Sequence, residues 1–202
     1  MVDGWENHTV SASCHAWVDE SIHVTARVPI YLLAAVVADD LAGESLRHDL
    51  RRLVRRPRQR LHWRDEEYED RMAAVTAIAK ADLSLIVVVG TPLDPRRQER
   101  ARRKCMERLF NCFRGVRGLD TVWIESRTVS LNQADEHMVV ALRGSRVIDA
   151  TVRCQFALSS SDPMLWPADV VAGAVGASYR GEPVYRGVLD PHLVVDEVDL
   201  VG

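Results

Sequence analysis

Residues 28–38, VPIYLLAAVVA, decide the fold, because they form a strand-length run that is apolar on both faces. A strand has this pattern when both faces of its sheet are covered. We therefore expect 28–38 to be a central strand with helices packed on either side. The stretch before it, 11–19, predicts a neighbouring strand that ends at the acidic pair Asp19 and Glu20.

Helical and strand patterns alternate downstream of these two strands. Apolar runs predict strands at 60–63, 83–89, 121–125 and 150–158. Apolar periodicity predicts helices at 40–54, 65–81, 95–114, 132–142 and 167–180, the first capped by Asp39 or Asp40. This order predicts a single α/β domain, a mixed β-sheet flanked by α-helices. Its parts are an N-terminal extension at 1–10, the domain at 11–180, and a C-terminal tail at 181–202 packed on the domain.

Composition limits the class of protein. The chain has 202 residues, 47% of them hydrophobic and 27% charged, which fits one globular domain. The four cysteines lack C-x-x-C spacing and no leader pattern precedes them, so we expect free thiols and a cytoplasmic protein. The longest apolar run is too short to span a membrane, so no membrane partner is expected.

Three separated acidic positions carry the chemistry. Asp19 and Glu20 end one predicted strand, Glu125 ends another, and Asp169 opens the last helix. Hard cations such as Mg²⁺ take oxygen ligands, and two such ions can act together on a phosphodiester. We therefore interpret Asp19, Glu125 and Asp169 as catalytic carboxylates that ligate two Mg²⁺ or Mn²⁺ ions, with Glu20 as an auxiliary metal ligand.

Each position also has an ordinary explanation. Asp19 can be a strand-end acid that faces water, and Glu125 a helix-capping or surface acid. Asp169 can pair with its helix dipole. His62, in the cluster His62-Trp63-Arg64-Asp65, can position a catalytic water or bind phosphate, or it can be a partly buried structural histidine.

An arginine-rich stretch, 47–60, begins within the first predicted helix and continues beyond its end. The net charge of −3 gives no overall signal for nucleic acid, so the distribution of charge matters more than its sum. Phosphate-binding candidates are Arg47, Arg51, Arg52, Arg55 and Arg58, several of which fall on one helical face. The alternative is a solvated face. The sequence lacks four common functional motifs: a P-loop, a G-x-G-x-x-G, a G-x-S-x-G and a zinc-type Cys/His set.

The ordered motifs resemble the bacterial domain-of-unknown-function thirty-eight-hundred family. The resemblance rests on 18–21 (VDES), on 123–125 (WIE), and on Ser159-Ser160 followed by 165–173 (LWPADVVAG), and it covers most of the chain. It implies a ribonuclease-H-like fold with a five-stranded mixed sheet and a two-metal carboxylate site. Pro167 departs from the family pattern and fits only in the first turn of its helix.

The sequence thus predicts a metal-dependent nuclease that hydrolyses phosphodiester bonds of DNA or RNA by a two-metal carboxylate mechanism, with nucleic acid as its partner. The alternative is a non-catalytic nucleic-acid-binding or protein-interaction subunit on the same fold, such as one associated with a defence system or a toxin. In that case a homodimer or a protein partner is expected, and the arginines would meet an acidic surface.

Overall fold

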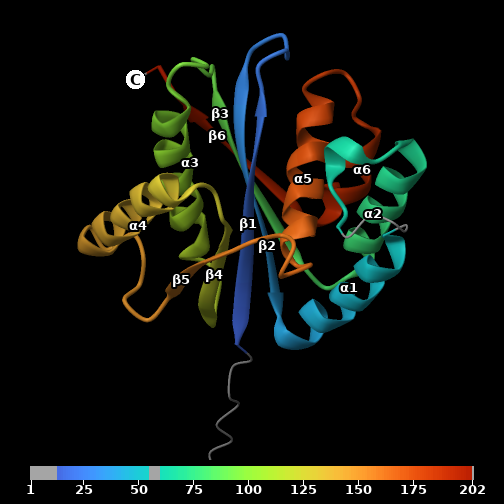
Figure 1. The fold of residues 1–202 in the computed structure, drawn as a ribbon, viewed down its shortest axis with the longest axis horizontal. Helices are drawn as coiled ribbons and strands as arrows, with labels where there is room; N and C mark the ends of the chain where they lie inside the picture. The colour runs from blue at the N-terminus through green and yellow to red at the C-terminus, as the bar shows by residue number, and fades with distance from the viewer. Residues whose placement is uncertain (1–12, 55–59, 202) are drawn as a thin grey trace, which may run out of the picture.

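The fold is built on one mixed β-sheet. In the computed structural model, which describes residues 13–54 and 60–201, six strands lie in the order β5-β4-β1-β2-β3-β6 (Figure 1). Their bounds are β1 Cys14–His23, β2 Ile30–Asp39, β3 Ser84–Thr91, β4 Leu119–Glu125, β5 Arg153–Ala157 and β6 Leu193–Asp199. Strand β2 runs antiparallel to β1 and β3, whereas β4 is parallel to β1, β5 to β4 and β6 to β3.

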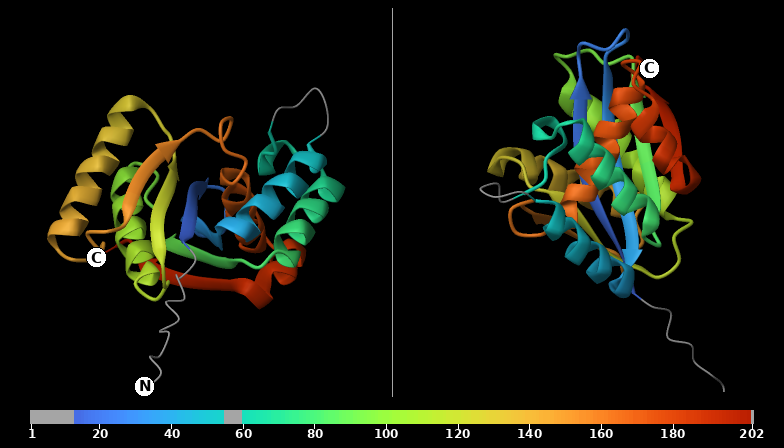
Figure 2. Two further views of the ribbon diagram at one scale, coloured as in Figure 1. Left: turned by 90° about the horizontal axis from the view of Figure 1, so that it is seen from below. Right: turned by 90° about the vertical axis from the view of Figure 1, so that its right-hand side faces the viewer.

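Helices cover both faces of the sheet. Their bounds are α1 Asp40–Leu53, α2 Tyr68–Lys80, α3 Gln98–Phe113, α4 Val129–Gly144, α5 Leu165–Ser178 and α6 Val184–Leu189, with short 3₁₀ helices at Trp63–Asp65 and Asp190–His192. Helices α1, α2, α5 and α6 pack on one face, and α3 and α4 pack on the other (Figures 1 and 2). The predicted α/β class, a single domain with a mixed sheet flanked by helices, is confirmed.

Strand β2 is the central strand that its sequence predicts. Every residue from Ile30 to Ala38 is buried. Leu32 and Val36 join the core under α1 and α5, whereas Tyr31 and Leu33 join the core under α3. This division follows from the twofold period of a strand.

Two local predictions about helix starts are confirmed. Asp39 caps α1, because its Oδ1 accepts a hydrogen bond from the backbone N–H of Ala42 at 2.8 Å. Pro167 is the third residue of α5, within the first turn, where its missing N–H costs nothing.

The predicted strand at 60–63 is wrong, and β1 is longer than predicted. Leu61 and Trp63 are buried in the alternating way that suggested a strand. However, the backbone N–H of Trp63 donates to the side chain of Asp169 instead of joining a sheet, and a 3₁₀ helix begins there. Strand β1 does not end at Asp19 but continues to His23, paired with β2 throughout.

The C-terminal residues differ from the tail we expected. Residues 184–189 form α6, and 193–199 form β6, an edge strand that pairs in parallel with β3. The sheet therefore has six strands instead of the five implied by the family resemblance. The predicted extension at 1–10 lies outside the described residues.

Two further expectations concern the thiols and the membrane. All four cysteines are free. Within the described part of the chain, no helix combines the length and the apolar character needed to cross a membrane.

Candidate active site

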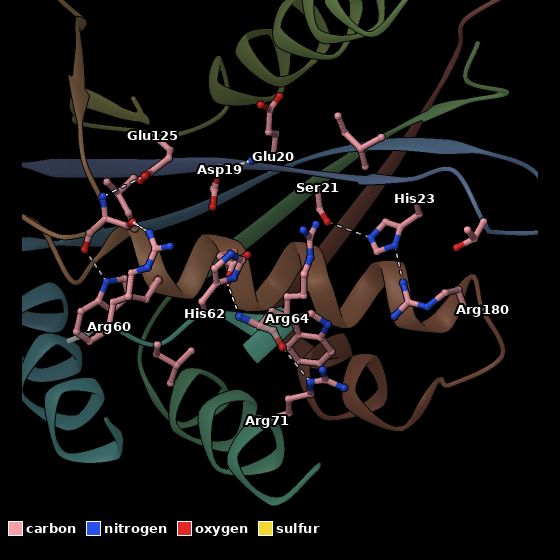
Figure 3. Close-up of a pocket in the computed structure, with 18 residues that line it drawn as sticks. Asp19, Glu20, Ser21, His23, Arg60, His62, Arg64, Arg71, Glu125 and Arg180 are labelled. Carbon is pink, nitrogen blue, oxygen red and sulfur yellow. Dashed lines mark hydrogen bonds and ion pairs between the residues drawn. The ribbon is translucent and has the colours of Figure 1, made fainter. Parts of the chain in front are cut away.

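A cavity of about 520 Å³ lies between β1, the start of α5 and the segment that precedes α2 (Figure 3). Its walls come from segments far apart in the chain: residues 19–23, 60–64, Glu125 at the end of β4, Ser159, the first turns of α5, and Arg180. Asp19, Glu125, Asp169 and His62, the predicted catalytic residues, all line it. The fold therefore brings the four predicted catalytic residues together in one cavity.

Strand β1 places Asp19 on the cavity side. Trp17, two residues earlier, belongs to the core under α1 and α5, so the alternation of the strand turns Asp19 to the same face. Its Oδ1 accepts a hydrogen bond from the backbone N–H of Glu20 at 2.7 Å. Burial of the carboxylate, the charge of Asp169 and smaller effects of Glu125 and Glu20 raise the pKa of Asp19 well above its usual range. A buried acid among like charges is the environment that a bound cation would relieve.

Asp169 holds the segment before α2 in place. Its Oδ2 accepts hydrogen bonds from the backbone N–H of Trp63 at 2.7 Å and from Nδ1 of His62 at 3.0 Å. Because a carboxylate can only accept, Nδ1 of His62 carries the proton. The hydrogen bond to Asp169 raises the pKa of His62 against the opposing effect of burial. The Nε2 atom of His62 makes no hydrogen bond with any described residue, so it is available to a ligand in the cavity.

Glu125 reaches the cavity from the tip of β4. Its Oε1 accepts a hydrogen bond from the backbone N–H of Ser159 at 3.1 Å. Its Oε2 is buried and has no hydrogen-bond partner among the described residues. Burial raises the pKa of Glu125, although the hydrogen bonds from Ser159 and the charge of Arg60 act the other way. A buried acceptor left without a donor is costly and calls for a partner from outside the chain.

The three carboxylates suit a hard cation in their chemistry. All their donors are oxygens, and Glu125 Oε2 is an orphaned buried acceptor. They do not form a closed set of ligands, because no cluster of three or more His, Cys, Asp or Glu side chains in residues 13–54 and 60–201 is placed to hold a metal ion. Oxygens of Asp169 and Glu125 already accept hydrogen bonds from the protein. The oxygen donors are therefore of the type that Mg²⁺ or Mn²⁺ takes, whereas the positions of these side chains do not form a metal site.

Glu20, predicted as an auxiliary metal ligand, points to the other side of the sheet (Figure 3). Its Oε2 lies 2.7 Å from Nη1 of Arg102 and accepts a hydrogen bond from the hydroxyl of Tyr31. Arg102 is almost fully buried and also pairs with Asp135 at 2.9 Å. The neighbouring position on a strand faces away from Asp19, so the carboxylate of Glu20 belongs to a buried ion network under α3 and α4.

Three of the predicted phosphate-binding arginines, Arg47, Arg51 and Arg52, do not line the cavity. Arg47 packs over the ring of Trp17 and pairs with Asp162 at 3.1 Å, so its guanidinium already has protein partners. Arg51 and Arg52 are exposed in the last turn of α1. Arg55 and Arg58 lie outside the described residues.

Some cavity residues were missed by the sequence reasoning. Ser21 and His23 share the face of Asp19, and the twofold period would have found them had the strand been extended to 23. Arg64 and Arg180 line the cavity from the segment before α2 and from the end of α5. Arg64 stands in the cluster His62-Trp63-Arg64-Asp65 without a role of its own, and no local pattern marks Arg180. Contacts between distant segments bring both to the site, through the bond from Trp63 to Asp169 and the packing of α5 at Gly176.

Comparisons with known proteins agree with the fold. No family model matches the chain, and no curated protein matches its sequence. A solved structure, a chain of the PCNA:RNase HII complex from Archaeoglobus fulgidus, matches with a TM-score of 0.51. The match covers 88% of this chain and 77% of that chain, at 12% sequence identity. The ribonuclease-H-like fold is therefore confirmed, whereas none of these comparisons shows the particular family that the sequence motifs resemble.

Proposed function

We propose that this chain is a nuclease that depends on divalent metal ions and hydrolyses phosphodiester bonds of DNA or RNA. The observation that carries the proposal is the cavity that Asp19, Glu125 and Asp169 line together, in which an oxygen of Glu125 is buried without a partner among the described residues. The three carboxylates come from β1, β4 and α5, and the fold is one shared with a ribonuclease.

Each residue has a distinct part in the proposed reaction. In hydrolysis a water oxygen bonds to phosphorus, one ester P–O bond breaks, and the departing oxygen takes up a proton. Asp19, Glu125 and Asp169 would hold Mg²⁺ or Mn²⁺, which when bound would supply an activated water and stabilise the leaving oxygen. His62, oriented by Asp169 through Nδ1, presents Nε2 to the cavity, where it binds the water or a phosphate oxygen.

Cleavage assays test the proposal directly. Pools of single- and double-stranded DNA and RNA oligonucleotides are incubated with the protein in Mg²⁺, in Mn²⁺ and in EDTA. We expect cleavage in the metal buffers, none in EDTA, and none with Asp19→Asn. Asp49→Asn is the matched control, because Asp49 is an exposed acid of α1. Equal cleavage by wild type and folded Asp19→Asn protein would refute the assignment.

One observation favours a second function, a non-catalytic nucleic-acid-binding or protein-interaction subunit. Asp169 Oδ2 already accepts hydrogen bonds from Trp63 and His62, which is what a structural carboxylate does. Metal titration separates the two functions. A nuclease should bind Mn²⁺ through Asp19, and a purely binding subunit should bind nucleic acid equally well in EDTA and with Asp19→Asn.

A further inference from the structure

The end of the cavity away from Glu125 differs in chemistry from the carboxylate end. Ser21, His23 and Arg180 lie there, and the side chain of Arg64 reaches toward Ser21 (Figure 3). Ser21 and His23 follow Asp19 on the same face of β1, so one strand carries both ends of the site. The cavity therefore joins an acidic half to a half made of hydrogen-bond donors.

The two arginines at this end have no acidic partner among the described residues. Arg64 is exposed and makes no ion pair there, and Arg180 bonds only to a ring nitrogen of His23. Elsewhere in the chain, Arg102, Arg108 and Arg127 each hold a carboxylate at 2.6–2.9 Å. Two uncompensated guanidinium groups at a cavity wall leave a local positive charge that an anion would balance.

The hydrogen bonds at this end fix the direction in which Ser21 donates. A guanidinium can only donate, so Nδ1 of His23 is the acceptor of the bond from Arg180. Burial and the charges of Arg180 and Arg64 lower the pKa of His23 to about 4, so the ring is neutral and carries its proton on Nε2. Nε2 lies 3.0 Å from Oγ of Ser21 and donates to it. The hydroxyl hydrogen of Ser21 is thereby left for another acceptor, and His23 cannot act as its base.

Two glycines build this arrangement. A Cβ on Gly176 would lie 2.0 Å from Nε2 of His23, so only glycine lets α5 pack against the ring there. Gly181, just after α5, has φ +93°. Its backbone N–H donates to the carbonyl oxygen of Ser178, and the N–H of Glu182 donates to the carbonyl oxygen of Ala177. A glycine in the left-handed region often ends a helix in this way. The turn holds Arg180 beside β1.

We propose that Ser21, Arg64 and Arg180 form a subsite for a phosphoryl group of the substrate. The guanidinium of Arg64 reaches toward the hydroxyl of Ser21, and that of Arg180 lies on the other side of the His23 ring. Guanidinium groups form strong, charge-assisted hydrogen bonds with phosphate oxygens, and a hydroxyl adds a further donor. Ser21 lies two strand positions from Asp19, roughly 7 Å along β1, a separation suited to the next phosphate of the same strand. The role of this subsite, to orient a nucleic-acid strand for cleavage, rests on the proposed nuclease function.

Binding of inorganic phosphate tests the subsite without cleavage. The full chain in EDTA is titrated with inorganic phosphate, by calorimetry and by NMR of the histidine side-chain nitrogens. We expect His23 to carry its proton on Nε2 and none on Nδ1. The chemical shifts of these ring nitrogens should change when phosphate binds. Arg64→Gln and Arg180→Gln should each weaken binding by about tenfold or more, and Ser21→Ala by several-fold. Arg103→Gln, the same change at an exposed position of α3, should leave binding unchanged.

Oligonucleotides identify which phosphate occupies the subsite. Tetranucleotides with a 5′-hydroxyl or a 5′-phosphate are compared on wild type and Arg64→Gln in EDTA. Equal weakening of both ligands by Arg64→Gln assigns the subsite to an internal phosphodiester. A wild-type preference for the 5′-phosphate that Arg64→Gln removes assigns it to a terminal phosphate. Unchanged binding of both ligands to Arg64→Gln and to Ser21→Ala overturns the proposal, as does a His23 ring with its proton on Nδ1.

The outcomes separate this inference from the nuclease proposal. Phosphate binding that persists in a protein without metal-dependent cleavage leaves the subsite standing and removes the nuclease. Cleavage with an unchanged KM in Arg64→Gln and Ser21→Ala leaves the nuclease and removes the subsite. Asp19→Asn should bind inorganic phosphate in EDTA at least as well as wild type.

Discussion

Asp169 Oδ2 lies 3.0 Å from Nδ1 of His62, a contact that joins α5 to a segment 107 positions earlier in the chain. The same oxygen accepts the backbone N–H of Trp63. One carboxylate therefore fixes both the orientation of the histidine ring and the path of the chain beside it. Asp169 serves the structure of the site as well as its proposed chemistry.

Asp19→Asn should separate function from stability. The pKa of Asp19 is raised by burial and by neighbouring carboxylates, so its negative charge is unfavourable in the metal-free protein. We expect metal-dependent cleavage to fall by at least about 100-fold, while the melting temperature in EDTA is no lower than that of wild type. Melting curves in EDTA and in Mg²⁺, run beside the cleavage assay, check both parts. A large drop in the melting temperature in EDTA would show instead that the charge supports the fold.

Glu20→Gln should lower stability and keep activity, the opposite of Asp19→Asn. Its carboxylate pairs with buried Arg102, so the change weakens a charge-assisted contact without touching the cavity carboxylates. We expect the free energy of unfolding to fall by about 1–3 kcal/mol and the activity per folded molecule to be kept. Urea unfolding measures the free energy of unfolding, and initial cleavage rates measure the activity per folded molecule. Loss of activity without loss of stability would return Glu20 to the metal site.

Gly173→Ala should destabilise the protein and disturb the site. A Cβ at Gly173 would lie 2.2 Å from Cγ of Trp63, near the fixed end of that side chain. We expect a loss of about 1–3 kcal/mol in the free energy of unfolding, since the ring and its neighbour His62 must move. Gly144→Ala is the control, because a Cβ there meets nothing within 4 Å. It should be neutral or stabilising, and equal effects of the two changes would contradict the packing described.

His23 should make stability depend on pH. Its pKa is about 4 in the folded protein, against 6.5 for an unperturbed histidine, so the unfolded chain binds more protons between these values. The free energy of unfolding should therefore fall as the pH is lowered from 6.5 toward 4, by at most about 1.4 kcal/mol per pH unit and by less because the ring is partly exposed.

Urea unfolding of His23→Gln across this pH range checks that prediction. The other titrating groups contribute equally to wild type and His23→Gln. The difference between the two slopes of the free energy of unfolding against pH is therefore due to His23. His48→Gln, at an exposed position of α1, is the control and should keep the wild-type slope. An identical slope in wild type and His23→Gln would show that the ring is not held neutral.

Arg51→Ala and Arg52→Ala test the exposed end of α1 as a path for the nucleic-acid backbone. If each arginine contacts one phosphate, each change should flatten the plot of log affinity against log salt by about 0.7–0.9. Affinity for all sequences should drop about equally, which fluorescence anisotropy on several oligonucleotides measures. An unchanged slope would mean that these side chains form a solvated face.

Local pattern in the sequence was enough for several parts of the molecule. Residues 28–38 are apolar on both faces, which only a central covered strand tolerates, and β2 is that strand. The position of Asp39 and Asp40 before a helical period predicted the cap of α1 to be one of these two residues, and it is Asp39. The twofold period of β1 placed Trp17 and Asp19 on one face, and the acids at the ends of three predicted elements are the carboxylates that line the cavity.

Tertiary structure alone decided the rest, since it depends on contacts between distant segments. Strand β1 continues to His23 because β2 pairs with it there, and β6 forms because β3 offers an open edge. Trp63 does not join a strand because Asp169, from α5, takes its N–H. Arg180 reaches the cavity only because α5 packs against β1 at Gly176, so the positive half of the site exists only in the folded chain.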